Sequence, residues 1–328
     1  MNRRAFLHTL TGGLLAVPLI ARAQPKTKTW RVGFLSGGGR SPDGAAPLPL
    51  RRALQDLGYV EPRDVVYESR WADGKQDRLP GLASELVRLH VDVIVTVGGP
   101  STAAANQASP SIPVVMALVG DADGLGLIDS LARPGGHVTG VTDQSVDLSA
   151  KRLEIITEAV PRAARIAVLW NASDRGMTLR YQEVEKAAQR LRVAVQPLGV
   201  REPDDFAAAF SSMIAHRPDA LVMVTDALTL LNRKRVIDFA LTHRIPAMYE
   251  AGPLVQDGGL MSYGANPDDN FRLAAGYVDR IFKGSSPSTL PVQRPGRYYL
   301  TINLKTAKAL GLTIPPALLL RADQVIDP

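Results

Sequence analysis

Small polar residues follow two predicted strands in the first half of the chain, in positions suited to binding an anion. Val97-Gly98-Gly99-Pro100-Ser101 leaves an apolar run, turns on two glycines and enters an alanine-rich helical stretch. The free N–H groups at Gly98 and Gly99 and the dipole of the helix favour a carboxylate there. Ser36, at the end of the first predicted strand, can donate a further hydrogen bond to the same anion. The alternatives are that Ser101 only caps its own helix and that Ser36 is an ordinary turn serine.

Carboxylates follow two predicted strands in the second half of the chain. Asp226 and Glu250 each come directly after an apolar run, so both can point into a cleft at the end of a sheet. A buried ammonium group needs such a partner, because an unpaired buried charge is strongly unfavourable. Either acid could instead cap the next helix or pair with Arg233 or Arg244. With the anion site, these acids would hold the two ends of an amino acid.

Aromatic residues close two strands on the same side. Trp170 and Asn171 end one predicted strand, and Tyr249 ends the strand before Glu250. A flat ring in this position can stack on an aromatic or unsaturated ligand. The alternative is that these rings pack at the rim of the sheet.

Short apolar runs alternate with amphipathic helical stretches, which is the pattern of βα units and a parallel sheet. The predicted strands are 31–36, 65–69, 91–97, 112–117, 138–141, 165–170, 193–196, 220–225, 245–249, 260–263 and 298–302. We therefore predict an α/β fold of two tandem doubly wound parallel-sheet lobes joined by a multi-strand hinge. Open parallel sheets bind ligands beyond the carboxyl ends of their strands, so we expect the ligand between the lobes.

A break at 142–148, where no helical period begins at once, separates the two series of strands. We expect the N-terminal lobe to contain residues 30–143 plus about 264–289, and the C-terminal lobe residues 144–263 plus about 290–328. In this arrangement the helix at 268–282 crosses back to the first lobe. The last predicted strand then returns to the second lobe, so that the chain crosses the hinge three times.

Residues 1–23 have the features of a cleaved export signal. A charged start at Arg3-Arg4 precedes the uncharged, mostly apolar stretch 5–20, and Ala21-Arg22-Ala23 is a small-x-small cleavage site. The order Arg3-Arg4-x-Phe6-Leu7 also resembles a twin-arginine signal. A retained anchor is the alternative. We expect the mature chain in the periplasm.

Composition excludes several classes of protein. The chain has no cysteine, and therefore no disulfide, thiolate metal site or lipid-anchor cysteine. Removing the three arginines of residues 1–23 from the 38 basic residues leaves 35 against 32 acids, a net charge of +3, with no basic cluster typical of nucleic-acid binding. There is no G-x-G-x-x-G, Walker loop or G-x-S-x-G motif and no paired histidines. We expect no cofactor, no metal and no enzymatic activity.

Four long motifs resemble one known family. They are Ser130–Gly140, Gly258–Gly264, Ala275–Gly284 and Leu300–Pro315, and the chain end Arg321–Ile326 is similar as well. Together they look like the solute-binding proteins of ABC importers for tryptophan or tyrosine. The resemblance implies a type I periplasmic-binding fold that closes on a small solute, such as an aromatic amino acid, and docks on a membrane permease.

Several expectations accompany this resemblance. We expect a monomer that binds no nucleic acid. The loop at 37–47, rich in glycine and proline, would influence ligand preference if it lines the cleft. The alternatives are a sensory ligand-binding protein that engages a receptor by the same closure, and an exported α/β enzyme.

Overall fold

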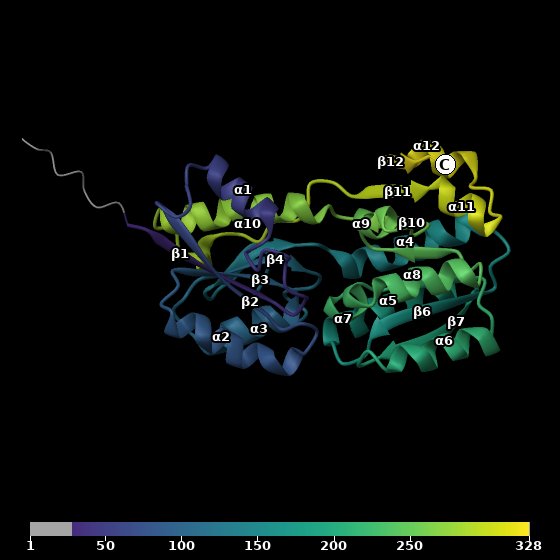
Figure 1. Ribbon diagram of the computed structural model, residues 1–328, viewed down its shortest axis with the longest axis horizontal. Coiled ribbons are helices and arrows are strands. Elements are labelled where there is room, and N and C mark those ends of the chain that lie inside the picture. Colours follow the sequence, from purple (N-terminus) through teal and green to yellow (C-terminus); the bar gives the residue numbers. More distant parts are fainter. Residues whose placement is uncertain (1–27, 328) are drawn as a thin grey trace, which may run out of the picture.

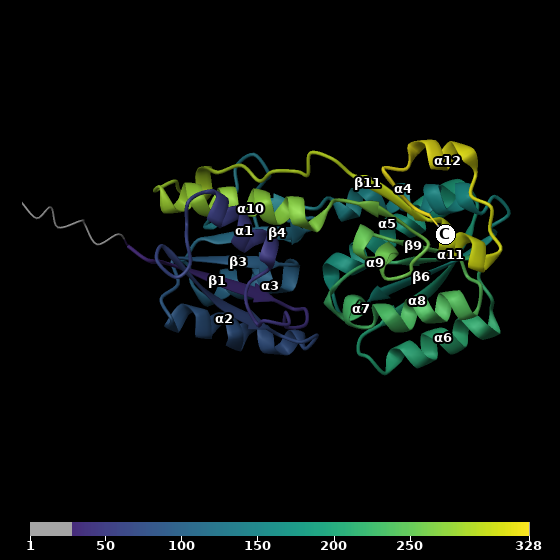
Figure 2. The same cartoon turned by 45° about the horizontal axis from the view of Figure 1, so that its top comes forward.

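The computed structural model describes residues 28–327, which fold into two α/β lobes lying side by side (Figures 1 and 2). The predicted export signal at residues 1–23 lies outside the described residues. Within 28–327, no helix has both the length and the apolar character needed to cross a membrane.

A parallel five-stranded sheet forms the centre of the N-terminal lobe. In sheet order its strands are β2 (Val65–Trp71), β1 (Trp30–Ser36), β3 (Val93–Val97), β4 (Val114–Val119) and β5 (Val138–Thr142). Both faces are buried, because α1 (Leu48–Asp56) and α10 (Pro267–Phe282) cover one, and α2 (Leu79–Arg88) and α3 (Gly99–Ala108) cover the other. Two short 3-10 turns, η1 (Gln76–Arg78) and η2 (Pro287–Thr289), complete this lobe.

A seven-stranded sheet forms the centre of the C-terminal lobe. In sheet order its strands are β12 (Gln324–Ile326), β11 (Tyr299–Asn303), β10 (Met261–Gly264), β9 (Ala247–Tyr249), β8 (Ala220–Met223), β6 (Arg165–Asn171) and β7 (Ala194–Val200). Only β10 and β11 pair in the antiparallel sense. One face carries α4 (Ser145–Ala159), α5 (Arg175–Leu191), α11 (Leu304–Leu310) and α12 (Pro316–Arg321). The other face carries α6 (Asp205–Ala215), α7 (Ala227–Leu231), α8 (Arg233–Thr242) and α9 (Gly252–Gln256).

The chain passes between the lobes three times. It runs from β5 to α4, from β10 to α10, and from η2 back to β11. The third passage starts later than the predicted boundary near residue 289, because Val292 is still buried in the first lobe and Gln293 pairs with Val141 of β5. The Tyr298 hydroxyl then donates a hydrogen bond to the side-chain oxygen of Gln144, joining the first and third passages.

This architecture confirms the predicted fold class of two doubly wound, mainly parallel lobes. Helices α1 and α10 each end two residues before a glycine. Gly58 and Gly284, which follow α1 and α10, have φ of 98° and 93°, a conformation that glycine adopts without steric cost. The parallel order places the carboxyl ends of both sheets at the gap between the lobes, and residues just beyond the strands therefore face one another.

Candidate ligand-binding site

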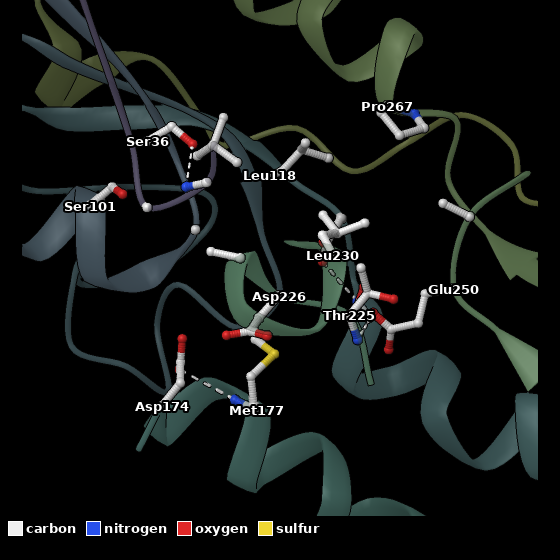
Figure 3. Close-up of a pocket in the computed structure, with 18 of the residues that line it drawn as sticks. Ser36, Ser101, Leu118, Asp174, Met177, Thr225, Asp226, Leu230, Glu250 and Pro267 are labelled. Carbon is white, nitrogen blue, oxygen red and sulfur yellow. Dashed lines mark hydrogen bonds between the residues drawn. The ribbon is translucent and has the colours of Figure 1, made fainter. Parts of the chain in front are cut away.

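A cavity of about 360 Å³ lies between the lobes, where the carboxyl ends of the two sheets meet (Figure 3). Its walls contain residues at or beyond the carboxyl ends of β1, β2, β3, β4, β6, β8 and β9 and from two of the three passages between the lobes. The polar residues among them are Ser36, Gln76, Ser101, Asp143, Ser145, Asp174, Arg180, Thr225, Asp226 and Glu250. The cavity therefore occupies the region in which the sequence predicts the ligand.

The first lobe contributes uncharged hydrogen-bond donors to the cavity. Ser36 Oγ accepts a hydrogen bond from the Gly38 N–H at 3.1 Å, which leaves the hydroxyl proton for another acceptor. Ser101 lies in the first turn of α3, and no partner of its hydroxyl is found within residues 28–327. Gly98, with φ of 84°, turns the chain into this helix and also lines the cavity. Its N–H is not free as predicted, because it donates to the Leu118 carbonyl at 2.8 Å. Gly99 borders only a smaller neighbouring cavity of about 20 Å³.

Asp226 both faces the cavity and caps a helix, two positions that the sequence analysis considered as alternatives. It lines the cavity and also caps α7, since Oδ1 accepts from the Thr229 N–H at 2.9 Å. Its Oδ2 accepts from Asn171 Nδ2 at 2.6 Å. Asn171 does not line the cavity, and it orients the Asp226 carboxylate instead.

Asp174 is a cavity residue that the sequence analysis missed. It caps α5, with Oδ1 accepting from the N–H groups of Gly176 at 2.8 Å and Met177 at 3.4 Å, and it is 6% exposed. No partner of Oδ2 is found in the described part of the chain. Burial, and next the negative charge of Asp226, raises the pKa of the Asp174 carboxyl above its ordinary value of 3.8. A cation placed beside these two acids would stabilise their charged forms and so oppose the rise in the pKa of Asp174.

Glu250 lines the cavity but already has cationic partners. Its Oε1 lies 2.9 Å from Arg152 Nη1, and its Oε2 lies 2.7 Å from Arg180 Nη1. All three side chains are almost fully buried. The predicted role of Glu250 as a free partner for an ammonium group therefore disagrees with the structure, and its partners are neither Arg233 nor Arg244.

The same ionic cluster reaches the hinge. Arg180 Nη2 lies 3.4 Å from Oδ2 of Asp143, which follows β5 at the first passage between the lobes. Arg152 Nε donates to the Tyr263 carbonyl at 2.7 Å, just before the second passage. The guanidinium groups are thus fixed between the floor of the cavity and two hinge segments.

The two predicted aromatic ligand contacts belong to the interior of the second lobe. The Trp170 ring stacks on Tyr181 of α5, with centroids 3.9 Å apart, and Tyr249 is 1% exposed in the core on the other face of the sheet. Neither residue lines the cavity. The large apolar side chains that do line it are aliphatic, namely Leu79, Val97, Leu118, Met177, Leu230 and Leu254.

We expect Trp170→Phe to leave ligand affinity unchanged and to lower the free energy of unfolding by about 1 kcal/mol, because part of the stacking on Tyr181 is lost. Urea unfolding measures the stability, and calorimetric titration measures the affinity. A large loss of affinity at unchanged stability would place Trp170 in the ligand site after all.

Within residues 28–327, no group of three or more His, Asp or Glu side chains is arranged to hold a metal ion. The cavity lining supplies hydroxyls, an amide, a guanidinium, carboxylates and apolar walls. Such a set can bind and orient a small polar molecule.

Comparison with known proteins gives matches along most of the chain. A family model described as ABC transporter substrate binding protein matches residues 48–326. A tyrosine-binding protein of Clostridioides difficile strain R20291 is 28% identical over 262 residues, which cover 80% of this chain and 75% of that protein.

Solved structures share the fold. An ABC domain from Streptococcus pneumoniae in complex with L-Trp aligns with a TM-score of 0.84 at 24% identity, over 91% of this chain and 100% of that one. A ligand-free, open substrate binding protein with adhesive properties from Clostridium difficile aligns with a TM-score of 0.65, also at 24% identity, over 92% of this chain and 100% of that one.

Proposed function

The chain belongs to the ABC transporter substrate-binding protein family, and on this basis we propose that it binds an amino acid with an aromatic or large apolar side chain for uptake by a membrane permease. The observation that carries the proposal is the division of polar groups in the cavity. Uncharged donors lie on the first lobe, and the second lobe contributes Asp174 and Asp226, neither of which forms an ion pair within residues 28–327. A zwitterion is complementary to this division.

The first lobe would hold the carboxylate of the ligand. Ser36 and Ser101 can each donate a hydroxyl proton, and the start of α3 adds the positive end of the helix dipole. Among the described residues of this lobe, no lysine or arginine lines the cavity. Recognition would therefore depend on the geometry of neutral donors.

The second lobe would hold the ammonium group between Asp174 and Asp226. Both acids keep one oxygen committed to a helix cap, which fixes their orientation before the ligand arrives. The neighbouring guanidinium of Arg180 is already balanced by Glu250 and Asp143. The ammonium would thus supply the missing positive charge.

The aliphatic walls would surround the side chain of the ligand. Leu79 and Leu118 of the first lobe and Met177 and Leu230 of the second line the cavity, and the Met177 sulfur can make a favourable contact with an aromatic ring. A volume of about 360 Å³ lies in the usual range for small-molecule sites. The tyrosine-binding relative and the L-Trp complex support an aromatic amino acid.

We further propose that the mature protein works in the periplasm as a monomer, without enzymatic activity. A ligand that contacts both lobes binds the closed state more tightly than the open one, and this difference is what drives closure. The closed form then presents one fixed surface to the permease.

Calorimetric titration of residues 24–328 tests the proposal with matched probes. L-Tryptophan and L-tyrosine are compared with tryptamine, which lacks the carboxylate, and with indole-3-propionate, which lacks the ammonium group. We expect the amino acids to bind and both truncated probes to bind much more weakly, because each leaves one set of polar groups unpaired. Equal binding of tryptamine would show that the first lobe does not recognise a carboxylate.

Asp226→Asn is expected to weaken amino-acid binding by about 1–3 kcal/mol, because the ammonium loses a charged acceptor. Asparagine caps a helix about as well as aspartate, so α7 keeps its start. Titration measures the affinity, and thermal unfolding checks the fold. Asp204→Asn, at an exposed helix start remote from the cavity, is the matched control and should bind like the wild type. Unchanged affinity in Asp226→Asn would remove this residue from the site.

A further inference from the structure

The lobes touch beside the cavity at three places where the first lobe contributes a glycine. A Cβ atom at Gly39 would lie 2.8 Å from Leu231 Cδ2, and one at Gly74 would lie 2.9 Å from Leu231 Cδ1. A Cβ atom at Gly120 would lie 2.7 Å from Arg180 Nη2. These separations are too short for real carbon contacts, so a methyl group cannot be added at any of the three positions without movement.

Backbone conformation accounts for only one of these glycines. Gly74 has φ of 81°, where a side chain is strained in any surroundings. Gly39 and Gly120 are not in the left-handed region. At these two positions the backbone accepts alanine, and the only obstacle is the side chain from the opposite lobe.

Arg180 is 4% exposed and has no room to move aside, whereas Leu231 is 46% exposed and can avoid an added methyl group only by turning toward solvent and leaving its contact with the first lobe. Both methyl groups of Leu231 face a glycine backbone, and the two glycine loops are held together by the hydrogen bonds from Gly74 N to Gly37 O at 2.8 Å and from Asp73 N to Gly38 O at 3.0 Å. Arg180 is held by Glu250 Oε2, 2.7 Å from its Nη1, and by Asp143 Oδ2, 3.4 Å from its Nη2. An added methyl group at Gly120 would therefore press the two lobes apart, and one at Gly39 would remove the Leu231 contact between them.

We propose that Gly39 and Gly120 are positioning residues for ligand binding, because their missing side chains let Leu231 and Arg180 of the second lobe reach the first lobe and so permit closure. Neither glycine lines the main cavity, so neither substitution replaces a residue of the cavity wall. The proposal depends on the proposed function only in that a ligand between the lobes stabilises the closed form. Alanine would penalise that form alone.

Disulfide trapping tests closure without any ligand. The Cβ of Ala227 lies 3.4 Å from the Cβ position of Gly37, close to the separation in a disulfide, and these residues are on opposite lobes. The chain has no cysteine of its own. In the Gly37→Cys/Ala227→Cys background, cross-linking under a mild oxidant therefore reports how often the lobes close.

We expect Gly39→Ala and Gly120→Ala each to slow this cross-linking by about tenfold, as a modest overpacking penalty confined to the closed form. Leu231→Ala should restore the rate in the Gly39→Ala background, since it removes the opposing methyl groups. Gly81→Ala, where a Cβ meets nothing within 4 Å, is the matched control and should not change the rate. Equal rates in all variants, or no cross-linking in the parent pair, would overturn the proposal.

Titration with L-tryptophan gives a second readout. In the background without cysteines, Gly39→Ala and Gly120→Ala should raise Kd by about tenfold while the melting temperature of the free protein stays unchanged. If the wild type binds no amino acid, the proposed function fails, and the cross-linking rates still decide the role of the glycines. If binding is unaffected in variants that cross-link more slowly, closure does not limit affinity and the assigned role in binding is wrong.

Discussion

Glu250→Gln is expected to lower the free energy of unfolding by about 3–5 kcal/mol, because it leaves buried guanidinium groups without their counter-charge. Glu250 lies between Arg152 at 2.9 Å and Arg180 at 2.7 Å. The change leaves Arg152 without any ion pair, since Glu250 is its only ion-pair partner among the described residues. Burial of Arg152 already lowers the pKa of its guanidinium. Urea unfolding at neutral pH measures the loss.

Asp257→Asn is the matched control for this change. Asp257 also pairs with an arginine, Arg233 at 2.6 Å, but both side chains are about half exposed. An exposed pair of this kind contributes less than about 1 kcal/mol, because water solvates the ions when the pair is broken. Similar losses in the two variants would mean that the Glu250 cluster contributes no more than a surface pair.

The Glu250 cluster also connects stability to the hinge. Arg152 donates to the Ser145 carbonyl at 3.0 Å and to the Tyr263 carbonyl at 2.7 Å, so one side chain contacts two of the passages between the lobes. Disorder at Arg152 would therefore loosen the hinge as well as the cavity floor. We infer that these buried ion pairs, although costly to desolvate, hold the cavity floor in a fixed position relative to the hinge.

The main strands were predictable because parallel strands covered on both faces have nearly continuous apolar runs. All eleven predicted strands form, with ends that shift by a few residues. β12 escapes prediction, since Gln324 and Val325 are exposed at the edge of the sheet and no apolar run marks them. The five-residue helices α7 and α9 are too short for a helical period to stand out.

The location of the site was predictable for a topological reason. Parallel strands place their carboxyl ends together, so Ser36, Gly98, Ser101 and Asp226 lie around one cavity. Side-chain direction and distant partners were not predictable. Trp170 lies in β6 and packs against α5, and no local pattern pairs Glu250 with an arginine 98 residues earlier. Asp174 lies three residues beyond β6 at the N-cap of α5, and an aspartate just before a helical stretch is the sequence signal that marks it.

Asp174→Asn is expected to stabilise the free protein and to weaken amino-acid binding by about 1.5–3 kcal/mol, the range for a hydrogen bond to a charged group. In the folded protein, burial and the Asp226 charge raise the pKa of Asp174 above 3.8, so the folded state binds the proton more tightly than the unfolded state does. The contribution of this residue to stability is therefore present at pH below about 4 and is lost as the pH rises through the raised pKa. Asparagine keeps the cap of α5 and has no such loss.

Two measurements test this opposition between stability and binding. In urea unfolding from pH 3.5 to pH 7, the free energy of unfolding of the variant should increase relative to that of the wild type as the pH rises. Titration with L-tryptophan at pH 7 should show that the variant binds more weakly. The two effects have one cause, because the negative charge that is costly in the empty cavity is the charge that a bound ammonium neutralises. Saturating ligand should therefore reverse the order of stability, since it stabilises the wild type more than the variant. A variant that is less stable at every pH and binds normally would show that Asp174 serves only as the cap of α5.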